Sequence, residues 1–294
     1  MDKTYTAQEN IRGGMYVAIA MLGFLANDSL IKYVTTDLYI GQIIFLRGSF
    51  ASLFLFLLCL RTNALLPPRQ IGNKLFAFRA GLEAFATITF LTALVHLPLS
   101  NISAILQALP LAVTLGAALL LGEKIGWRRI TAILVGFFGV LLIIQPGFGD
   151  FSFYSILVIL SVLAAAGRDL VTRKMPENVP SLFISLYTSI VITCMGAVMT
   201  VLHGWESVSW LVLAYIAAAS IFIIVGYFFI IAGMRVGETG FVTPFRYTVL
   251  IWALLVGYVA FDEVPNTLML IGSAIVVGMG LYAFHRERTL AKQG

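Results

Sequence analysis

The sequence predicts an all-α polytopic membrane protein with about ten transmembrane helices. Of its 294 residues, 60% are hydrophobic and only 11% are charged, and the mean hydropathy is +0.97. A soluble domain of this length carries roughly a quarter of its residues as charged side chains. Runs such as 53–60 and 111–121 are continuously apolar, whereas the strands of a membrane barrel would alternate with a period of two. The solvent of this fold is therefore lipid.

The apolar segments have the length that a helix needs to cross the hydrocarbon, about 20 residues. The segment after Arg12 lacks a small-residue cleavage site, so we interpret it as a retained span rather than a signal peptide. The short connections predict no soluble domain. The expected spans are 14–34, 38–60, 73–96, 100–121 and 127–145 in the first half, and 152–173, 179–202, 208–232, 238–260 and 264–285 in the second.

The basic residues predict the orientation, because cytoplasmic connections carry an excess of lysine and arginine. With both termini in the cytoplasm, about 15 of the 19 Lys and Arg residues fall on the inner side. We therefore expect a multi-pass protein of a bacterial inner membrane. The inner residues are Lys3, Arg12, Arg61, Arg69, Lys74, Arg79, Lys124, Arg128, Arg129, Arg173, Lys174, Arg235, Arg286, Arg288 and Lys292.

Other functional classes find no support in the sequence. The basic residues are scattered and form no phosphate-binding stripe, which argues against nucleic acid as a partner. Cys59 and Cys194 lie in apolar segments, and the three histidines are far apart, so we expect no metal site. No hydrolase, metalloprotease or nucleotide-binding motif is present, which predicts neither an enzyme nor a cofactor.

The two halves resemble each other at a shift of about 140 residues. The sequence NDSL at 27–30 corresponds to RDL at 168–170, and LGE at 121–123 corresponds to FDE at 261–263. Five spans per half is an odd number, so the halves must enter the membrane in opposite directions. We expect two inverted five-helix repeats, residues 1–148 and 149–294. Glu123 and Glu263 are expected to cap or orient the helix that follows each of them.

These residues also carry a resemblance to a known family. The stretches HLPLS at 96–100, QALP at 107–110, LLGEK at 120–124 and GFFGVLL at 136–142 are similar to the EamA-type repeat of the drug/metabolite transporter superfamily. FDEVP at 261–265 is a degenerate copy. The resemblance implies a secondary transporter that moves a small organic molecule. The repeat favours alternating access, and the Gly-x-x-Gly patches are compatible with either a monomer or a homodimer.

Three shorter stretches are similar to a bacterial subgroup that includes riboflavin and S-adenosylmethionine importers. They are Asp28 with Lys32-Tyr33, QIIFLR at 42–47 and PFRY at 244–247. S-adenosylmethionine carries a sulfonium cation, so its binding site should contain acidic groups. In the spans of this chain, arginines are at least as prominent as carboxylates. The subgroup resemblance therefore predicts riboflavin uptake first. The alternatives are S-adenosylmethionine uptake and export of amino acids or metabolites.

Charged residues inside the spans are the leading site candidates, because a charge in hydrocarbon is costly and normally faces a cavity or a partner. Arg47 and Glu83 fall at comparable depth in neighbouring antiparallel spans, which predicts an ion pair. The pair either lines the substrate-binding cavity, with Glu83 as a protonatable coupling group, or only locks two helices together.

A second set of charges occupies related positions in the two repeats. Asp28 and Lys32 are spaced i,i+4 near the outer end of the first span. Arg168 and Asp169 lie near the inner end of the sixth span. The functional interpretation is a pair of gates or coupling sites that act alternately. The alternative is interfacial anchoring by long polar side chains.

Prolines interrupt the fourth and ninth spans at corresponding places. Pro110 follows Gln107, and Pro244 precedes Arg246 and Tyr247. A proline inside a helix removes one backbone hydrogen bond, and paired broken helices are typical of binding sites in transporters with inverted repeats. We therefore predict that Gln107, Arg246 and Tyr247 bind substrate. The alternative is that both kinks serve packing alone.

Overall fold

The computed structural model describes residues 6–65, 74–122, 126–146, 152–175, 179–237 and 239–291. Every regular element among these residues is a helix, which confirms the predicted all-α class. Eight helices are long and apolar enough to cross a membrane, and Ile130–Ile144 and Thr267–Ala283 are shorter apolar helices. All ten predicted segments are thus helical.

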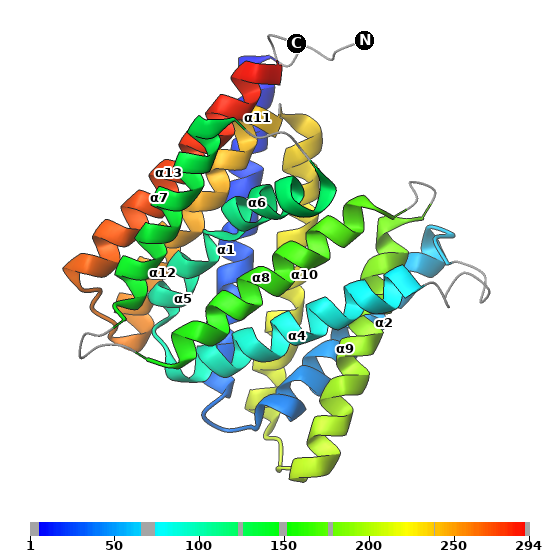
Figure 1. Cartoon of the computed structure of the whole chain (residues 1–294). Coiled ribbons are helices and arrows are strands. Elements are labelled where there is room, and N and C mark those ends of the chain that lie inside the picture. The colour runs from blue at the N-terminus through cyan, green and yellow to red at the C-terminus, as the bar shows by residue number, and fades with distance from the viewer. Residues whose placement is uncertain are drawn as a thin grey trace. The chain divides into compact units, whose positions relative to one another are not determined.

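Most helices begin and end within a few residues of the predicted limits, whereas the first helix starts seven residues earlier and the last helix ends six residues later than predicted (Figure 1). They form because a chain in lipid must satisfy its backbone hydrogen bonds within each segment. The first half contains α1 (Ala7–Val34), α2 (Ile40–Arg61), α4 (Lys74–His96), α5 (Leu99–Leu106), α6 (Leu109–Leu121) and α7 (Trp127–Ile144). The second half contains α8 (Tyr154–Arg173), α9 (Ser181–His203), α10 (Trp210–Val236), α11 (Thr239–Val242), η1 (Thr243–Tyr247), α12 (Thr248–Phe261) and α13 (Thr267–Ala291).

The fourth and ninth spans are interrupted helices. Between α5 and α6 the backbone tightens, because the amides of Gln107 and Ala108 donate to carbonyls three residues earlier, at 3.2 and 3.0 Å. Pro110 lies in the first turn of α6, where its missing N–H breaks no intrahelical bond. Pro244 has the equivalent place in the first turn of the 3₁₀ segment η1. Each proline therefore starts a new helix after a break.

The chain divides into two compact units, and neither is a half of the sequence. Unit 1 comprises residues 1–29, 97–155 and 221–294, and unit 2 comprises 30–96 and 156–220. Each unit contains helices from both halves of the chain. A five-helix half is therefore not a compact body by itself, because its helices pack against those of the other half.

In unit 2, α2 packs along α9, and both are second segments of their halves. Glycines allow the close approach: a Cβ on Gly196 would lie 2.5 Å from the backbone nitrogen of Phe45. Hydroxyl groups add cross-helix hydrogen bonds, with Ser52 Oγ lying 2.9 Å from Ser189 Oγ. Close backbone contact through small residues, with polar side chains between the helices, is typical of membrane helix pairs.

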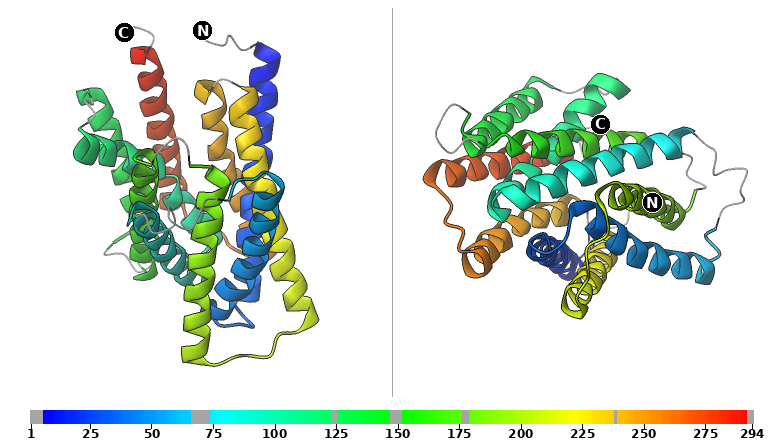
Figure 2. Two further views of the ribbon diagram at one scale, coloured as in Figure 1. Left: turned by 90° about the vertical axis from the view of Figure 1, so that its right-hand side faces the viewer. Right: turned by 90° about the horizontal axis from the view of Figure 1, so that it is seen from below.

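In unit 1, α7 packs along α13, and both are fifth segments of their halves (Figure 2). Here Gly139 and Gly272 face each other, because a Cβ on Gly139 would lie 2.9 Å from the Gly272 carbonyl oxygen. The helix α1 approaches the later part of α10 in the same way, through Gly13 and Gly233. Both units thus rest on glycine contacts between the two halves of the sequence.

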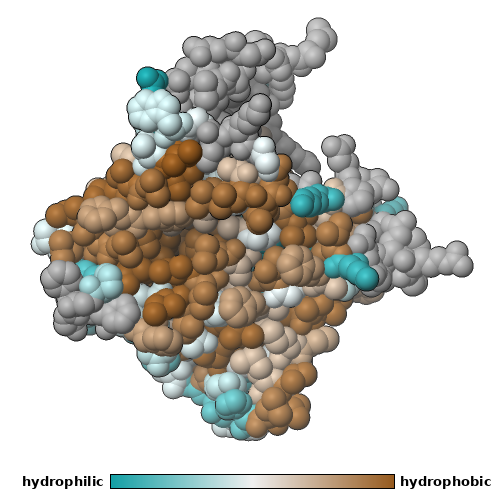
Figure 3. All heavy atoms as spheres, viewed as in Figure 1, coloured by the Kyte–Doolittle hydropathy of each residue, from teal (hydrophilic) through white to brown (hydrophobic). Residues whose placement is uncertain are grey.

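The surface of the molecule is largely apolar. The face drawn in Figure 3 is dominated by hydrophobic residues, and hydrophilic ones appear there only in small patches. Large apolar side chains such as Leu53, Phe54, Phe56 and Leu57 of α2 are exposed. A soluble protein rarely exposes apolar surface on this scale. These side chains face lipid, as expected for a multi-pass membrane protein.

Glu263 caps a helix, but not the helix predicted. Its Oε1 accepts a hydrogen bond of 2.8 Å from the Leu99 amide, and its Oε2 accepts one of 3.3 Å from the Ser100 amide. The carboxylate therefore stabilises the N-terminus of α5, where helix amides lack partners and the helix dipole favours negative charge. The following helix α13 is capped by Asn266, whose Oδ1 accepts from the Met269 amide at 2.8 Å. Glu123, the other predicted cap, lies outside the described residues.

This cap gives a first testable prediction. Replacing Glu263 with alanine should lower the free energy of unfolding by about 1–2 kcal/mol, because two amides of α5 lose their acceptor. The change should appear as a lower melting temperature of the protein in detergent. Glu263→Gln keeps one oxygen acceptor and should lie between alanine and wild type. An alanine variant as stable as wild type would contradict the capping role.

Candidate functional site

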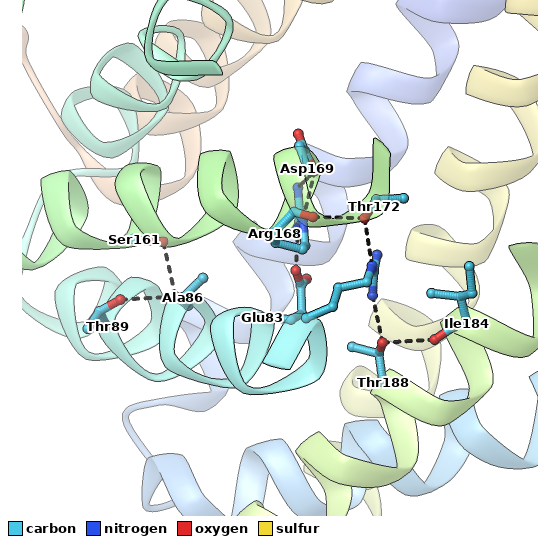
Figure 4. Close-up of polar contacts among 10 residues, drawn as sticks. Glu83, Ala86, Thr89, Ser161, Arg168, Asp169, Thr172, Ile184 and Thr188 are labelled. Atoms are coloured by element: carbon cyan, nitrogen blue, oxygen red, sulfur yellow. Dashed lines mark hydrogen bonds and ion pairs between the residues drawn. The ribbon is translucent and has the colours of Figure 1, made fainter. Parts of the chain in front are cut away.

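A group of polar side chains gathers on three helices of unit 2 and includes three of the predicted site residues (Figure 4). Helix α4 contributes Arg79 and Glu83, which are four residues apart and share a face. Helix α8 contributes side chains with the same spacing, at 168 and 172, and helix α9 contributes one threonine. We call this group the α4–α8–α9 polar cluster: Arg79, Glu83, Arg168, Asp169, Thr172 and Thr188.

Arg168 is the centre of the charged contacts. Its Nη1 donates to Glu83 Oε2 across the two helices, and its Nε donates to Asp169 Oδ1 at 2.8 Å. The side chains of Arg168 and Glu83 are each 20% exposed, and that of Asp169 is 40% exposed. One guanidinium is thus held between two carboxylates in a mostly desolvated place. Ion pairs in such surroundings persist because each charge would be costly without the other.

Glu83 forms an ion pair with Arg168 on α8, a partner that the sequence did not indicate. The partner expected from the sequence was Arg47 on α2. Depth along two neighbouring spans suggested Arg47, but depth does not determine which face of a helix meets which neighbour. The observed pair joins a residue of the first half of the chain to one of the second half. The predicted Arg47–Glu83 pair remains a prediction.

Arg79 also belongs to the cluster, although it was predicted to lie in an inner connection. It is the sixth residue of α4. Its Nε donates to Thr172 Oγ1 at 2.8 Å, and its Nη1 donates to Thr188 Oγ1 at 2.6 Å. One arginine thus ties α4 to both α8 and α9. Its i,i+4 spacing from Glu83 is the sequence signal that could have revealed it.

The threonine hydroxyls are oriented by their own helices. Thr172 donates to the carbonyl of Arg168, and Thr188 donates to the carbonyl of Ile184, each at 2.8 Å. Because each hydroxyl proton is used in this way, its oxygen is presented to Arg79 as an acceptor. Threonine–arginine contacts of this kind fix the guanidinium without adding a charge.

The cluster lies within the membrane-spanning length of the helices. Glu83 is nine residues from the start of α4, which is about 14 Å at 1.5 Å per residue. Arg168 is five residues from the end of α8, which is about 8 Å. The ends of these helices meet in an apolar group in which Phe76, Met175 and Phe183 are all buried. We call these three residues, together with Ile184, the apolar plug.

The remaining predicted residues occupy the following places. Arg47 is partly buried on α2, in unit 2, and Lys32 is near the end of α1. Gln107 is buried at the C-terminal end of α5, in unit 1, at the helix break. Asp28, also on α1, accepts a hydrogen bond of 2.9 Å from the Asn27 side chain. Arg246 is exposed in η1.

The aromatic residues of η1 are seated against glycines of unit 1. A Cβ on Gly14 would lie 2.7 Å from ring carbons of Phe245, and a Cβ on Gly280 would overlap the hydroxyl of Tyr247. Any larger residue at either glycine would force the ring of Phe245 or Tyr247 to move. The two glycines therefore make room for the aromatic rings that follow Pro244.

The sequence matches the family model described as "EamA-like transporter family" twice, over residues 11–145 and 152–283. The chain belongs to this family. The two matched ranges correspond to the two halves of the chain. The EamA-like transporter is accordingly a multi-pass membrane carrier and not an enzyme.

Several relatives with named substrates cover most of the transporter. It is 25% identical to an S-adenosylmethionine uptake transporter of Rickettsia prowazekii over 97% of this chain and 95% of the relative. It is 27% identical to a riboflavin transporter of Brucella anthropi over 72% of this chain and 77% of the relative. It is 25% identical to the pseudopaline exporter CntI of Pseudomonas aeruginosa over 91% of this chain and 94% of the relative.

A solved crystal structure shares the fold of the EamA-like transporter. The TM-score is 0.63, the sequences are 18% identical, and the match covers 95% of this chain and 98% of the other. The comparison supports the architecture alone. Among the described residues of the transporter, no group of three or more His, Cys, Asp or Glu side chains is placed to hold a metal ion.

Proposed function

We propose that the EamA-like transporter imports a small organic metabolite across the bacterial inner membrane by alternating access, with riboflavin as the leading substrate. Its repeats correspond to residues 1–148 and 149–294, and both termini face the cytoplasm. Substrate-binding roles for Arg47, Glu83, Gln107, Arg246 and Tyr247 are part of this proposal. Asp28 and Lys32 are proposed as gate or coupling residues near the outer end of α1.

The ion pair between Glu83 and Arg168 is the observation that carries the mechanism. It connects the first half of the chain to the second, about 8–14 Å from helix ends that carry basic residues, which favours the cytoplasmic side. The apolar plug lies at those same helix ends. We assign the pair and the plug to an inner gate: the plug excludes water, and separation of the pair opens the path.

The charge of the cluster favours a neutral substrate. Arg79 and Arg168 balance Glu83 and Asp169, so the four ionised side chains sum to zero. A cationic substrate would need an excess of carboxylates, since a charge in a desolvated site requires an opposite partner. Riboflavin is neutral, whereas S-adenosylmethionine carries a sulfonium cation.

S-adenosylmethionine is the second candidate, and a specific observation favours it. The Rickettsia prowazekii relative named for its uptake is 25% identical to this chain over 97% of its length. Export of an amino acid or metabolite is the third candidate. It is favoured by the similarity to the pseudopaline exporter of Pseudomonas aeruginosa.

Uptake measurements test these candidates directly. Radiolabelled riboflavin and S-adenosylmethionine are supplied in parallel to auxotrophic bacteria that express the protein. We expect saturable uptake of riboflavin, and a Glu83→Gln variant with wild-type expression should lose most of it. Saturable uptake of S-adenosylmethionine alone would replace the leading substrate. Uptake of neither would favour export, and resistance to toxic metabolite analogues would then be measured.

A further inference from the structure

Two buried polar atoms of unit 1 have no hydrogen-bond partner among the described residues. They are the side-chain carbonyl oxygen of Asn27 on α1 and the indole nitrogen of Trp252 on α12. One is an acceptor and the other is a donor. Buried polar groups in native proteins are nearly always paired, so each exception requires an explanation. Inside the hydrocarbon of a membrane, the free-energy cost of an unpaired polar atom is higher still, because water is scarce there.

The unpaired oxygen of Asn27 lies on the buried side of α1. Asn27 is 2% exposed and continues the buried stripe of α1 formed by Val17, Ala20 and Ile31. Its Nδ2 donates to Asp28 Oδ1 at 2.9 Å, which fixes the orientation of the amide. A flipped amide would set its oxygen against that carboxylate. The oxygen without a partner is therefore a defined acceptor in an otherwise apolar stripe.

Trp252 lies at a comparable depth. It is nine residues before the end of α12, about 14 Å along the helix, and Asn27 is seven residues before the end of α1, about 10 Å. By the charge pattern, both helix ends are on the outer side. An apolar residue at either position would avoid the cost of an unpaired group. The two side chains thus offer hydrogen bonds that the protein itself does not use.

We propose that Asn27 and Trp252 each bind a neutral hydrogen-bonding group of the transported molecule, namely an imide, an amide or a hydroxyl. The inference rests on the proposed transport function. The Asn27 oxygen accepts from an N–H or O–H of the substrate, and the Trp252 indole donates to a substrate oxygen or ring nitrogen. The two residues select by hydrogen bonding and not by charge.

The test uses Asn27→Leu and Trp252→Phe, which remove the polar atoms and keep a branched or an aromatic side chain in their place. We expect each variant to raise the KM for uptake about tenfold, the usual loss when a neutral hydrogen bond to a ligand is removed. In the absence of substrate, Trp252→Phe should melt close to the wild-type temperature, because removal of the unpaired group offsets the packing lost with the smaller ring. Trp210→Phe, at a position 87% exposed, is the matched control and should leave KM unchanged.

A panel of ligands separates failure of the inference from failure of the proposed function. The melting temperature of the purified protein is measured with riboflavin, S-adenosylmethionine, uracil and ribitol. We expect a neutral ligand to stabilise the wild type and not the two variants. Uptake by the wild type with unchanged KM in both variants would overturn the inference and leave the proposed function standing.

Two further results would also be decisive. Wild-type cells that take up neither labelled substrate would overturn the proposed function. The inference would then survive only if a neutral ligand of the panel stabilised the wild type alone. A variant that melts well below wild type and keeps its KM would assign the polar atom to a structural water and overturn the inference.

Discussion

Replacing Arg168 with leucine should abolish transport and destabilise the protein. The change leaves Glu83 as an unpaired charge in a place where its side chain is 20% exposed, and it removes one partner of Asp169. Loss of one member of a buried ion pair typically costs about 3–5 kcal/mol. We expect a lower melting temperature in detergent and uptake reduced to background in cells with matched expression.

A double variant separates the structural role of the pair from its role in transport. Glu83→Gln with Arg168→Gln removes both charges and keeps hydrogen-bonding groups, so most of the lost stability should return. Uptake should not return, because the uncharged pair can no longer hold the inner gate closed. The matched control is Arg61→Leu at the exposed end of α2, which should behave as wild type. Full transport by the double variant would reduce the pair to a structural role.

Gly272→Leu should be the most disruptive single substitution in unit 1. A Cβ at this position would lie 2.5 Å from the carbonyl oxygen of Gly139 and 3.1 Å from the amide nitrogen of Ile143. Both contacts are with backbone, which cannot rotate away as a side chain can. Overpacking of a well-packed core costs typically about 1–3 kcal/mol, and more where backbone must move. We expect α7 and α13 to separate and the yield of folded protein to fall sharply.

The same helix supplies the control. Gly278 also lies on α13, and a Cβ there meets nothing within 4 Å. Gly278→Leu should therefore give a monodisperse protein with near wild-type melting temperature in size-exclusion chromatography and thermal denaturation. Equal losses in both variants would show that leucine is disruptive anywhere on α13. The close contact of Gly139 with Gly272 would then not be the cause.

Much of the fold follows from the sequence because lipid imposes simple requirements. A segment of about 20 apolar residues must be a helix that satisfies its own backbone, so ten such segments predicted ten helical spans. Pro110 and Pro244 marked the interrupted spans for a local reason as well, since proline lacks the amide proton that a continuous helix needs. These inferences concern each segment alone, and no knowledge of its neighbours is required.

Side-chain contacts between different helices were harder to predict. The ion pair of Glu83 with Arg168 was not predicted, and Glu263, which was expected to cap or orient α13, caps α5. In each case the sequence showed a charge that needed a partner but not which helix would bring one. That choice depends on helix rotation and crossing, which small residues set by allowing close approach.

The sequence by itself determined the lipid solvent, the helical conformation of the ten apolar segments, the two interrupted helices and the presence of charged residues inside the spans. Hydropathy, charge and proline act through local chemistry and can be read along the chain. Only the tertiary structure decided that helices from both halves build each compact unit. It also placed Arg79 with Thr172 and Thr188, and left polar atoms of Asn27 and Trp252 without partners. These facts depend on which faces of distant segments meet, and packing between helices determines that.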